Sequence, residues 1–316
     1  MDQQGRVFSV LIIGCGAIAG GYDAENMQSP DILTHAKAFQ THPGFEMVAC
    51  VDPDGDKAQE FSGKWAIPKH YTMLSEALRA QKYDIISICS PTASHEACLR
   101  EIESHGAKLV FCEKPITGDI SSARLMVQRF RHKMVVNYLR RWDPALISLA
   151  GEIASGKYGK LISAQAHYNK GLYNNGSHMI DLLGMFFGDL TVVSAGRPVY
   201  DFWPDDASLD ARLLTKEGQP IEFVGGDVRE GMRFDLYLRF EKAKISLEKF
   251  SDHIRMEFAD GHIETRKSSL SRGMYQAVSN IYDHLVKDEK LLSTQENGLK
   301  AMEVCADIRI KAGLEG

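Results

Sequence analysis

The apolar residues follow different patterns in the two halves of the chain. In the first half, short and continuously apolar runs alternate with segments of helical periodicity. The apolar runs are Phe8–Ile13, Met47–Val51, Ile85–Cys89 and Leu109–Cys112, and the helical segments include Asp54–Trp65, Ser75–Ala80 and His95–His105. Continuously apolar strands are typical of parallel sheets that are buried on both faces. The alternation therefore predicts βαβ units and a doubly wound α/β domain with a parallel sheet over residues 1–142.

A further helix of this domain is expected to begin at Ser29-Pro30. Serine is a favoured N-cap residue, and proline fits the first turn of a helix. Ile32, Ala36 and Phe39 would share the buried face of this helix, and His42-Pro43-Gly44 would end it.

After Trp142 the pattern changes to a period of two. Phe234, Leu236, Leu238 and Phe240 alternate with polar residues, which is typical of an antiparallel sheet with one buried face. Helices are expected at 144–155, 178–187 and 295–312, and we leave open that the last one packs back on the first domain. The pattern predicts an α+β domain over 143–316 with a large, open, mainly antiparallel sheet. At roughly 150 residues per domain, a length of 316 residues also favours two domains.

Composition excludes several classes of protein. The chain has 37 Lys and Arg residues against 42 Asp and Glu residues, a net charge of −5, so it lacks the basic surface that nucleic acid requires. The longest uncharged run, Val7–Tyr22, is shorter than the about 20 residues of a membrane span. We therefore expect neither nucleic acid nor a membrane as partner.

The six cysteines indicate the compartment. No C-x-x-C pair occurs, and most of the cysteines lie in or beside apolar runs, which is typical of reduced cysteines in the cytoplasm. A lipoprotein signal ending at Cys15 is the alternative interpretation of residues 6–15. The single Arg6 beside Asp2 is a weak signal of this kind, and processing there would remove the first strand.

A glycine-rich turn follows the first strand directly. Gly14, Gly16 and Ala19 form a G-x-G-x-x-A pattern, in which the first glycine permits a tight turn and the second permits close approach of a pyrophosphate. Asp52 ends the next strand, where a carboxylate accepts hydrogen bonds from the ribose hydroxyls of NAD. The spacing exceeds the usual one because of an extra loop at 22–30. A carboxylate without a neighbouring arginine favours NAD over NADP.

Two further sets of residues stand at the ends of predicted elements. Ser90-Pro91-Thr92 and Glu113-Lys114-Pro115 follow apolar strands, and ligands bind at the carboxyl ends of parallel strands. In the second half, a polar loop leads from Lys170 to His178 at the start of an apolar helix, with Asp181 on the same face. A metal site is not expected here, because no further ligands occur at zinc spacing.

The segments GCGAIAG, VDPD, SPTASH, EKP and NNGSHMIDLL occur in this order across nearly the whole chain. As a set they resemble the Gfo/Idh/MocA oxidoreductases, named for glucose–fructose oxidoreductase and inositol dehydrogenase. The resemblance implies an N-terminal Rossmann domain and a C-terminal α+β domain whose open sheet joins subunits into a dimer or tetramer. It also implies NAD(P)-dependent oxidation or reduction of a ring hydroxyl of a sugar, cyclitol or nucleotide-sugar.

The resemblance implies catalytic roles for Lys114 and His178. The histidine would take the proton of the hydroxyl group while hydride leaves the carbon, and the lysine ammonium would stabilise the charge on the oxygen. The aspartate that often precedes the family's histidine falls on Asn174, which forms hydrogen bonds but carries no charge. We therefore expect a Lys–His pair rather than a full triad.

The remaining site residues follow from the same motifs. The expected cofactor-binding residues are Gly14, Gly16, Ala17, Ile18, Asp52, Ser90, Pro91, Thr92, His95, Glu113 and Lys114. The expected substrate-binding residues are Lys114, Arg141, Lys170, Tyr173, Asn174, Asn175 and His178. Cations and amides of this kind suit a large polar ligand. The alternative interpretation of Arg140 and Arg141 is that they are surface charges.

The substrate that we favour is a nucleotide-sugar, such as a UDP-N-acetyl-hexosamine oxidised at C3. A free-sugar or inositol dehydrogenase is one alternative, because it would use the same lysine and histidine. A non-catalytic NAD-binding regulator is the alternative from another class. Retention of both Lys114 and His178 disfavours a regulator, whereas Asn174 favours it.

Overall fold

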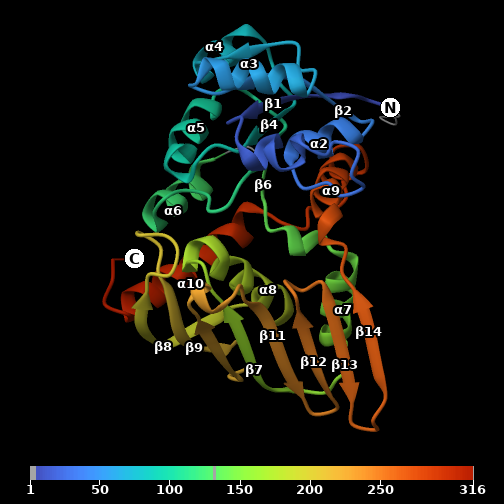
Figure 1. Cartoon of the computed structure of the whole chain (residues 1–316), viewed down its shortest axis with the longest axis vertical. Helices are drawn as coiled ribbons and strands as arrows, with labels where there is room; N and C mark the ends of the chain where they lie inside the picture. The colour runs from blue at the N-terminus through green and yellow to red at the C-terminus, as the bar shows by residue number, and fades with distance from the viewer. Residues whose placement is uncertain (1–4, 131–132, 316) are drawn as a thin grey trace. The chain divides into compact units, whose positions relative to one another are not determined.

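The computed structural model describes residues 5–130 and 133–315, which divide into two units (Figure 1). The first unit contains the chain up to Trp142 together with Ser271–Gly298. The second contains Asp143–Leu270 together with the residues from Leu299 onward. Residues 271–298, which the sequence pattern grouped with the second half, thus belong to the first unit.

The first unit is built around a six-stranded parallel sheet. The strands are β1 (Phe8–Ile13), β2 (Phe45–Val51), β3 (His70–Tyr71), β4 (Ile85–Ile88), β5 (Leu109–Cys112) and β6 (Lys133–Val136). Their order is β3-β2-β1-β4-β5-β6, and every pairing is parallel. This is the Rossmann order, which reverses between β1 and β4 and so leaves a ligand crevice at their carboxyl ends. The predicted doubly wound sheet is confirmed.

Helices connect these strands. They are α1 (Tyr22–Ala24), α2 (His35–Thr41), α3 (Gly55–Lys64), α4 (Leu74–Ala80), α5 (His95–Ile102), α6 (Ile120–Arg129) and α9 (Gly273–Lys287), with short turns at η1 (Ala17–Gly21), η2 (Thr92–Ser94) and η3 (Leu139–Trp142). Asp54 caps α3 by accepting the backbone N–H of Lys57 at 3.2 Å, and Asp119 caps α6 in the same way through Ser122 at 2.8 Å.

The prediction that α2 begins at Ser29-Pro30 is wrong, because α2 begins at His35 behind the N-cap Thr34. The cause is the buried carboxylate of Asp23, which accepts hydrogen bonds from Leu33 N at 3.0 Å and from Thr34 Oγ1 at 2.7 Å. The Lys37 ammonium lies 3.4 Å from the same carboxylate and donates to Ser29 O at 3.0 Å. These bonds hold the residues before Thr34 in a loop.

α9 is an amphipathic helix that completes the core of the first unit. Met274, Ala277, Val278 and Ile281 are buried in the same cluster as Phe8. A Cβ at Gly44 would lie 2.1 Å from the Tyr282 ring, so the turn before β2 packs directly on α9. Burial of this apolar face gives residues 271–298 their place in the first unit.

The second unit contains an eight-stranded sheet in the order β14-β13-β12-β11-β7-β10-β9-β8. The strands are β7 (Leu161–Tyr168), β8 (Leu190–Val199), β9 (Ser208–Thr215), β10 (Pro220–Gly225), β11 (Phe234–Phe240), β12 (Ala243–Glu248), β13 (His253–Phe258) and β14 (Ile263–Lys267). All neighbours are antiparallel except β7 and β10. The predicted large, mainly antiparallel sheet is confirmed.

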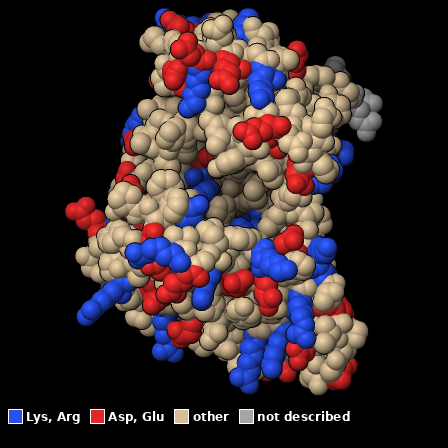
Figure 2. Space-filling view, in the orientation of Figure 1, with Lys and Arg blue, Asp and Glu red and all other residues tan. Residues whose placement is uncertain are grey.

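The two faces of this sheet differ. Phe234, Leu236, Leu238 and Phe240 are buried on the face that also carries apolar residues of the helices α7 (Pro144–Ala154), α8 (Ser177–Phe187) and α10 (Gln295–Lys311). Short helical segments occur at η4 (Leu172–Gly176), η5 (Val228–Glu230) and η6 (Leu270–Arg272). The opposite face is polar over β11–β13, and Figure 2 shows basic side chains in this region with acidic ones beside them. A groove on this polar face is lined by residues that include Gln165, Tyr237, Arg239, Lys244, Arg255 and Glu257.

α10 spans the boundary between the units. A Cβ at Gly298 would lie 2.9 Å from the side chain of Val136, so its first turn packs in the first unit. From Leu299 onward the helix belongs to the second unit, where Lys300 pairs with Asp189 and Cys305 Sγ lies 3.9 Å from Leu172 O. The first turn of the final helix thus belongs to the first unit, and its remainder belongs to the second.

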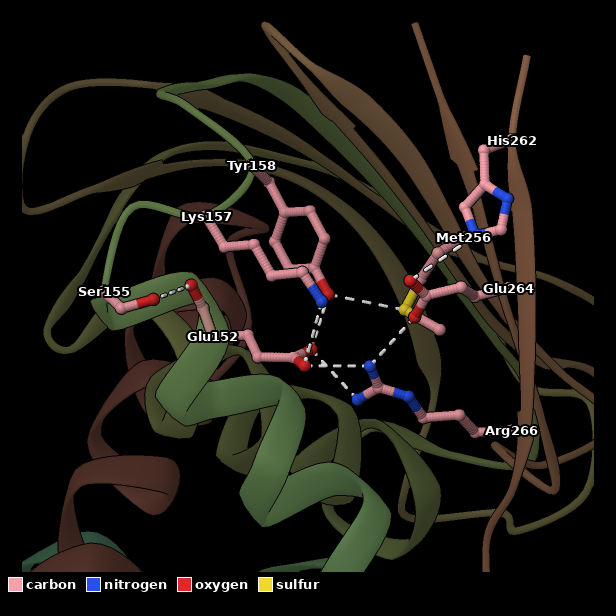
Figure 3. Close-up of polar contacts among 8 residues, drawn as sticks. All are labelled: Glu152, Ser155, Lys157, Tyr158, Met256, His262, Glu264 and Arg266. Carbon is pink, nitrogen blue, oxygen red and sulfur yellow. Dashed lines mark hydrogen bonds and ion pairs between the residues drawn. The ribbon is translucent and has the colours of Figure 1, made fainter. Parts of the chain in front are cut away.

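A polar cluster fastens α7 to the edge strand β14 (Figure 3). The Glu152 carboxylate accepts two bonds from Arg266, at 2.8 and 2.9 Å, and one from Tyr158 Oη at 2.5 Å. Lys157 donates a further bond at 3.1 Å, and Arg266 also contacts Glu264. Hydrogen bonds led by those from Arg266 lower the pKa of Glu152 to about 2.

None of the helices within residues 5–130 and 133–315 combines the length and the apolar composition that a membrane span requires.

Candidate functional site

The turn after β1 has a conformation that requires glycine. Gly14 has φ +85°, and a Cβ at this position would lie 2.6 Å from the backbone of Ser90. Its N–H donates to Val51 O at 2.7 Å. The glycine thus lets the ends of β1, β2 and β4 approach one another.

The second glycine of the turn has a different role. No atom of the described residues lies within 4 Å of a Cβ built at Gly16. Its carbonyl accepts bonds from Gly20 and Gly21 at 3.2 Å, and Ala17 and Ile18 follow at the start of η1. The backbone here is open to a phosphate, and a Cβ would intrude into that space.

Close packing behind the turn involves a residue that the motif did not single out. Ala19 is fully buried, as expected, but Gly20 makes the closest approach, since its Cβ would lie 2.3 Å from Trp65 Nε1. The small residue at this position lets η1 pack against the end of α3.

Asp52 lies against the glycine turn. Its Oδ2 accepts the N–H of Cys15 at 2.9 Å and its Oδ1 accepts that of Asp54 at 3.1 Å. The side chain is nearly buried, and Lys57 Nζ lies 4.0 Å from Oδ2. The carboxylate expected to meet the ribose is therefore held beside the turn expected to meet the pyrophosphate.

The loops after β4 and β5 are joined by one histidine. The ring of His95, 1% exposed, contacts Ser90 O and Pro115 O, each at 2.9 Å. Both ring nitrogens are thus used inside the protein. His95 therefore holds the two loops together, and its contact with the cofactor stays a prediction. Pro91 is exposed and Thr92 half-buried in the first of these loops.

A buried polar network lies beside Lys114. Glu113 Oε1 accepts hydrogen bonds from His35 Nε2 at 2.8 Å and from Asn137 Nδ2 at 2.5 Å, and the other ring nitrogen of His35 lies 2.8 Å from Ser87 Oγ. At least this oxygen of Glu113 is used within the protein, and contact of Glu113 with the cofactor stays a prediction. His35 was missed, because nothing in its local sequence distinguishes it from another residue of α2.

The network carries charge. Burial opposes protonation of the His35 ring, but Cys89 and the Glu113 carboxylate raise the pKa of His35 to about 10. Burial alone would raise the pKa of Glu113, yet hydrogen bonds from His35 and Asn137, together with the charges of His35 and Lys114, lower it. His35 and Glu113 thus form a buried ion pair.

Lys114 follows Glu113 at the carboxyl end of β5, is half-buried, and precedes a cis peptide bond to Pro115. Arg141 is half-buried in η3, and Arg140 beside it is buried. No hydrogen-bond partner of the buried Asn137 Oδ1 occurs among the described residues. An orphaned buried oxygen near Lys114 and the open backbone at Gly16 fit a dinucleotide cofactor at this edge of the sheet.

In the second unit, two aspartates hold the loop that leads to His178. Asp206 accepts the N–H groups of Tyr173 and Asn174 at 2.9 and 2.8 Å, and Asp201 accepts that of Lys170 at 2.7 Å. Gly171 has φ +92°, and a Cβ there would lie 2.3 Å from Asp206 Oδ2. Neither Asp201 nor Asp206 was expected in the site from the sequence.

The two asparagines of this loop support its backbone. Asn174 Nδ2 donates to Lys170 O at 3.0 Å, and Asn175 Nδ2 donates to Asn169 O at 3.0 Å. Their amide nitrogens therefore support the loop, and contact of both asparagines with substrate stays a prediction. His178 is half-buried in the first turn of α8, with the buried Asp181 one turn later. Lys114 and His178 belong to different units.

Comparisons with known proteins agree with this architecture. Residues 8–139 match the model of an oxidoreductase family with an NAD-binding Rossmann fold, GFO_IDH_MocA. The chain is 23% identical over 208 residues to D-apiose dehydrogenase of Paraburkholderia graminis, covering 60% of this chain and 52% of that protein. It is 31% identical over 130 residues to inositol 2-dehydrogenase of Rhizobium meliloti, covering 40% and 38%. The chain thus spans about half or less of the length of these relatives.

Solved structures resemble the whole chain. One is the WlbA dehydrogenase of Bordetella pertussis in complex with NADH and UDP-GlcNAcA, with a TM-score of 0.82 and 18% identity over 98% of this chain and 97% of that one. At this identity the likeness shows the fold. Within the chain, residues 8–139 match the NAD-binding Rossmann domain of the Gfo/Idh/MocA oxidoreductases, and the chain as a whole is similar in fold to a dehydrogenase.

Proposed function

We propose that this protein is an NAD-dependent dehydrogenase that oxidises a ring hydroxyl of a sugar, or reduces the corresponding ketone. The observation that carries this proposal is the junction of three loops at the carboxyl edge of the first sheet. Gly14 lies against Ser90, and His95 ties Ser90 to Pro115, the neighbour of Lys114. A cofactor held by the glycine turn would thus have a lysine beside it.

The cofactor would be held by Gly14, Gly16, Ala17, Ile18, Asp52, Ser90, Pro91 and Thr92. When bound, nicotinamide exchanges hydride with the carbinol carbon. The Lys114 ammonium donates a hydrogen bond to the substrate oxygen and stabilises its negative charge. His178 accepts the hydroxyl proton during oxidation and returns it during reduction.

NAD is the cofactor that we favour, since the Asp52 carboxylate would repel the 2′-phosphate of NADP. The neighbouring Lys57 makes this preference worth measuring. The cysteines of the described residues are buried and form no disulfide bond there, which supports a reducing compartment, the cytoplasm. We further propose that the polar face of the second sheet joins two or four copies, which sedimentation of the purified protein would test.

A nucleotide-sugar, such as a UDP-N-acetyl-hexosamine oxidised at C3, is the substrate that we favour. Tyr173, Lys170 and Arg141 would contact it, and a neighbour in fold binds UDP-GlcNAcA. The similarity to an inositol 2-dehydrogenase favours a second candidate, oxidation of a free sugar or cyclitol. A regulator that binds NAD without turnover is the third.

The experiment measures NADH formation with nucleotide-sugars, free sugars and inositols, for the wild type and for Lys114→Met. The protein is first checked for bound cofactor, and a ketone acceptor is added in case NADH release limits turnover. Turnover that is lost in Lys114→Met supports the dehydrogenase. Tight NAD binding without any turnover would replace it by the regulator.

A further inference from the structure

Three loops meet at one end of the second sheet, the upper end in Figure 1. They follow β7, connect β8 to β9, and connect β10 to β11. Asp201 joins all three, because it accepts hydrogen bonds from Lys170 N at 2.7 Å, Ser208 Oγ at 3.0 Å and Val228 N at 3.1 Å. Asn169 adds bonds to Gly231 O and Arg233 N. The loops therefore form a fixed framework.

Two large aromatic rings stand exposed on this framework. Phe202 is 48% exposed and Trp203 is 43% exposed, with ring centroids 4.9 Å apart and planes at 76°. Both follow Asp201 directly, so the anchored carboxylate fixes the backbone that carries them. Exposed aromatic side chains that are grouped and anchored are typical of a binding surface.

A cation is held beside these rings. Lys170 Nζ lies 4.4 Å from the centroid of the Phe202 ring, within the range of a cation–π contact. The backbone of Lys170 has φ +71°, which the hydrogen bond to Asp201 helps to hold. A second cation, the Arg309 guanidinium, lies 5.8 Å from the Tyr173 ring of the same loop.

We propose that Phe202, Trp203 and Lys170 form an aromatic platform that binds the base and diphosphate of a nucleoside diphosphate group on the substrate. The proposal rests on the proposed function and gives its substrate class. A base offers a flat π-face to the rings, and a diphosphate offers negative charge to Lys170 and Arg309. A free sugar or cyclitol carries neither group. Lys170, one member of the platform, lies on the loop that leads to His178 in α8, and Asp201 joins this loop to the loop of Phe202 and Trp203.

Tryptophan fluorescence tests the platform without turnover. Trp65 and Trp142 are 2% exposed, so Trp203 is the tryptophan that a ligand in solution reaches. Titration with UDP is expected to quench part of the emission to saturation, whereas inorganic pyrophosphate, which has no base, leaves the emission unchanged. Trp203→Phe should remove this quenching. Phe202→Ala and Lys170→Met should weaken UDP binding about tenfold.

Phe250→Ala is the matched control, since Phe250 is 39% exposed but lies in the β12–β13 turn. It should bind UDP like the wild type, and thermal melting should show that every variant is folded. Absence of quenching by UDP would overturn the platform. Dissociation of an oligomer by Phe202→Ala with unchanged UDP binding would overturn it as well, because the rings would then join two copies of the chain.

Failure of the platform and failure of the proposed function give different results. Turnover of free sugars without UDP binding would refute the platform and retain the dehydrogenase. Saturable UDP binding without turnover of any sugar would retain the platform and refute the dehydrogenase.

Discussion

The imidazole Nε2 of His35 lies 2.8 Å from Oε1 of Glu113, the residue that precedes Lys114. His35 comes from α2 and Glu113 from the end of β5, so the pair links a helix to the loop of the candidate catalytic lysine. The His35 side chain is fully buried and that of Glu113 is 13% exposed. Solvent therefore screens the attraction between the two side chains only weakly.

Removal of His35 is predicted to leave the Glu113 charge without its main partner. His35→Leu should lower the free energy of unfolding by about 3 kcal/mol, because a broken buried ion pair is costly. His35→Gln retains a donor for Glu113 and should cost about 1 kcal/mol. Chemical denaturation measures both variants. Equal losses would show that packing, not the pair, determines the cost.

The raised pKa of His35, to which Cys89 and Glu113 both contribute, makes the stability of the protein depend on pH. The pKa of His35 is raised from 6.5 to about 10 in the folded protein, so protonated His35 stabilises the fold fully below pH 6.5. This contribution is lost as the pH rises through 10. The difference in stability between wild type and His35→Gln should therefore shrink from pH 6.5 to pH 10. A difference that stays constant over this range would contradict the raised pKa.

The two glycines of the turn predict opposite effects of an added methyl group. Gly14→Ala should destabilise the protein by more than about 2 kcal/mol, because φ is positive and the Cβ would meet the Ser90 backbone at 2.6 Å. Gly16→Ala should melt like the wild type and yet bind NADH at least about tenfold more weakly, since the methyl group would occupy the space of the phosphate. Calorimetry and NADH fluorescence measure the two effects. Normal NADH binding by Gly16→Ala would remove the glycine turn from the cofactor site.

Asp52 and Lys57 predict how cofactor choice can be changed. Asp52→Ala should raise kcat/KM for NADP relative to NAD by about tenfold or more, because the carboxylate is gone and the ammonium remains. The double variant Asp52→Ala, Lys57→Met is the control and should lose this gain. If Asp52→Ala leaves the ratio unchanged, Asp52 does not contact the ribose.

Glu152 and Arg266 predict acid sensitivity of the second unit. The pKa of Glu152 is lowered from 4.5 to about 2, so its charge stabilises the fold above pH 4.5 and ceases to do so as the pH falls through 2. Glu152→Gln should cost about 2 kcal/mol at neutral pH, and the difference from wild type should vanish toward pH 2. Lys287→Gln, which breaks the exposed pair with Asp283, should leave the free energy of unfolding nearly unchanged. If both variants lose a similar amount of the free energy of unfolding, the Glu152 cluster stabilises the fold no more than an exposed ion pair does.

The sequence predicted those parts of the fold that depend on local patterns. Continuous apolar runs identified β1, β4 and β5, and the period of two identified β11, because burial on two faces or on one selects these patterns directly. The start of α2 was missed because a distant carboxylate, Asp23, fixes the loop before it. The return of α9 to the first unit was missed because its apolar face does not reveal which core it completes.

The candidate site shows the same limit. Glycines and the E-K-P motif are recognised by their spacing, since each has a local conformational role. His35, Asp201 and Asp206 act through residues remote in the sequence, so only the folded chain brings them to the site. Phe202 and Trp203 gave no signal either, because an aromatic residue is usually buried and only the structure shows these two exposed.

Lys114 and His178 are proposed to act on the same substrate oxygen, and a double-variant cycle tests this proposal. Lys114→Met and His178→Gln should each lower kcat for the best sugar substrate at least about a hundredfold at saturating NAD. The losses of kcat caused by two groups that act as a unit do not multiply. The double variant should therefore have a kcat only slightly below that of the less active single variant. Losses that multiply in the double variant, or a single variant that keeps wild-type kcat, would contradict the claim.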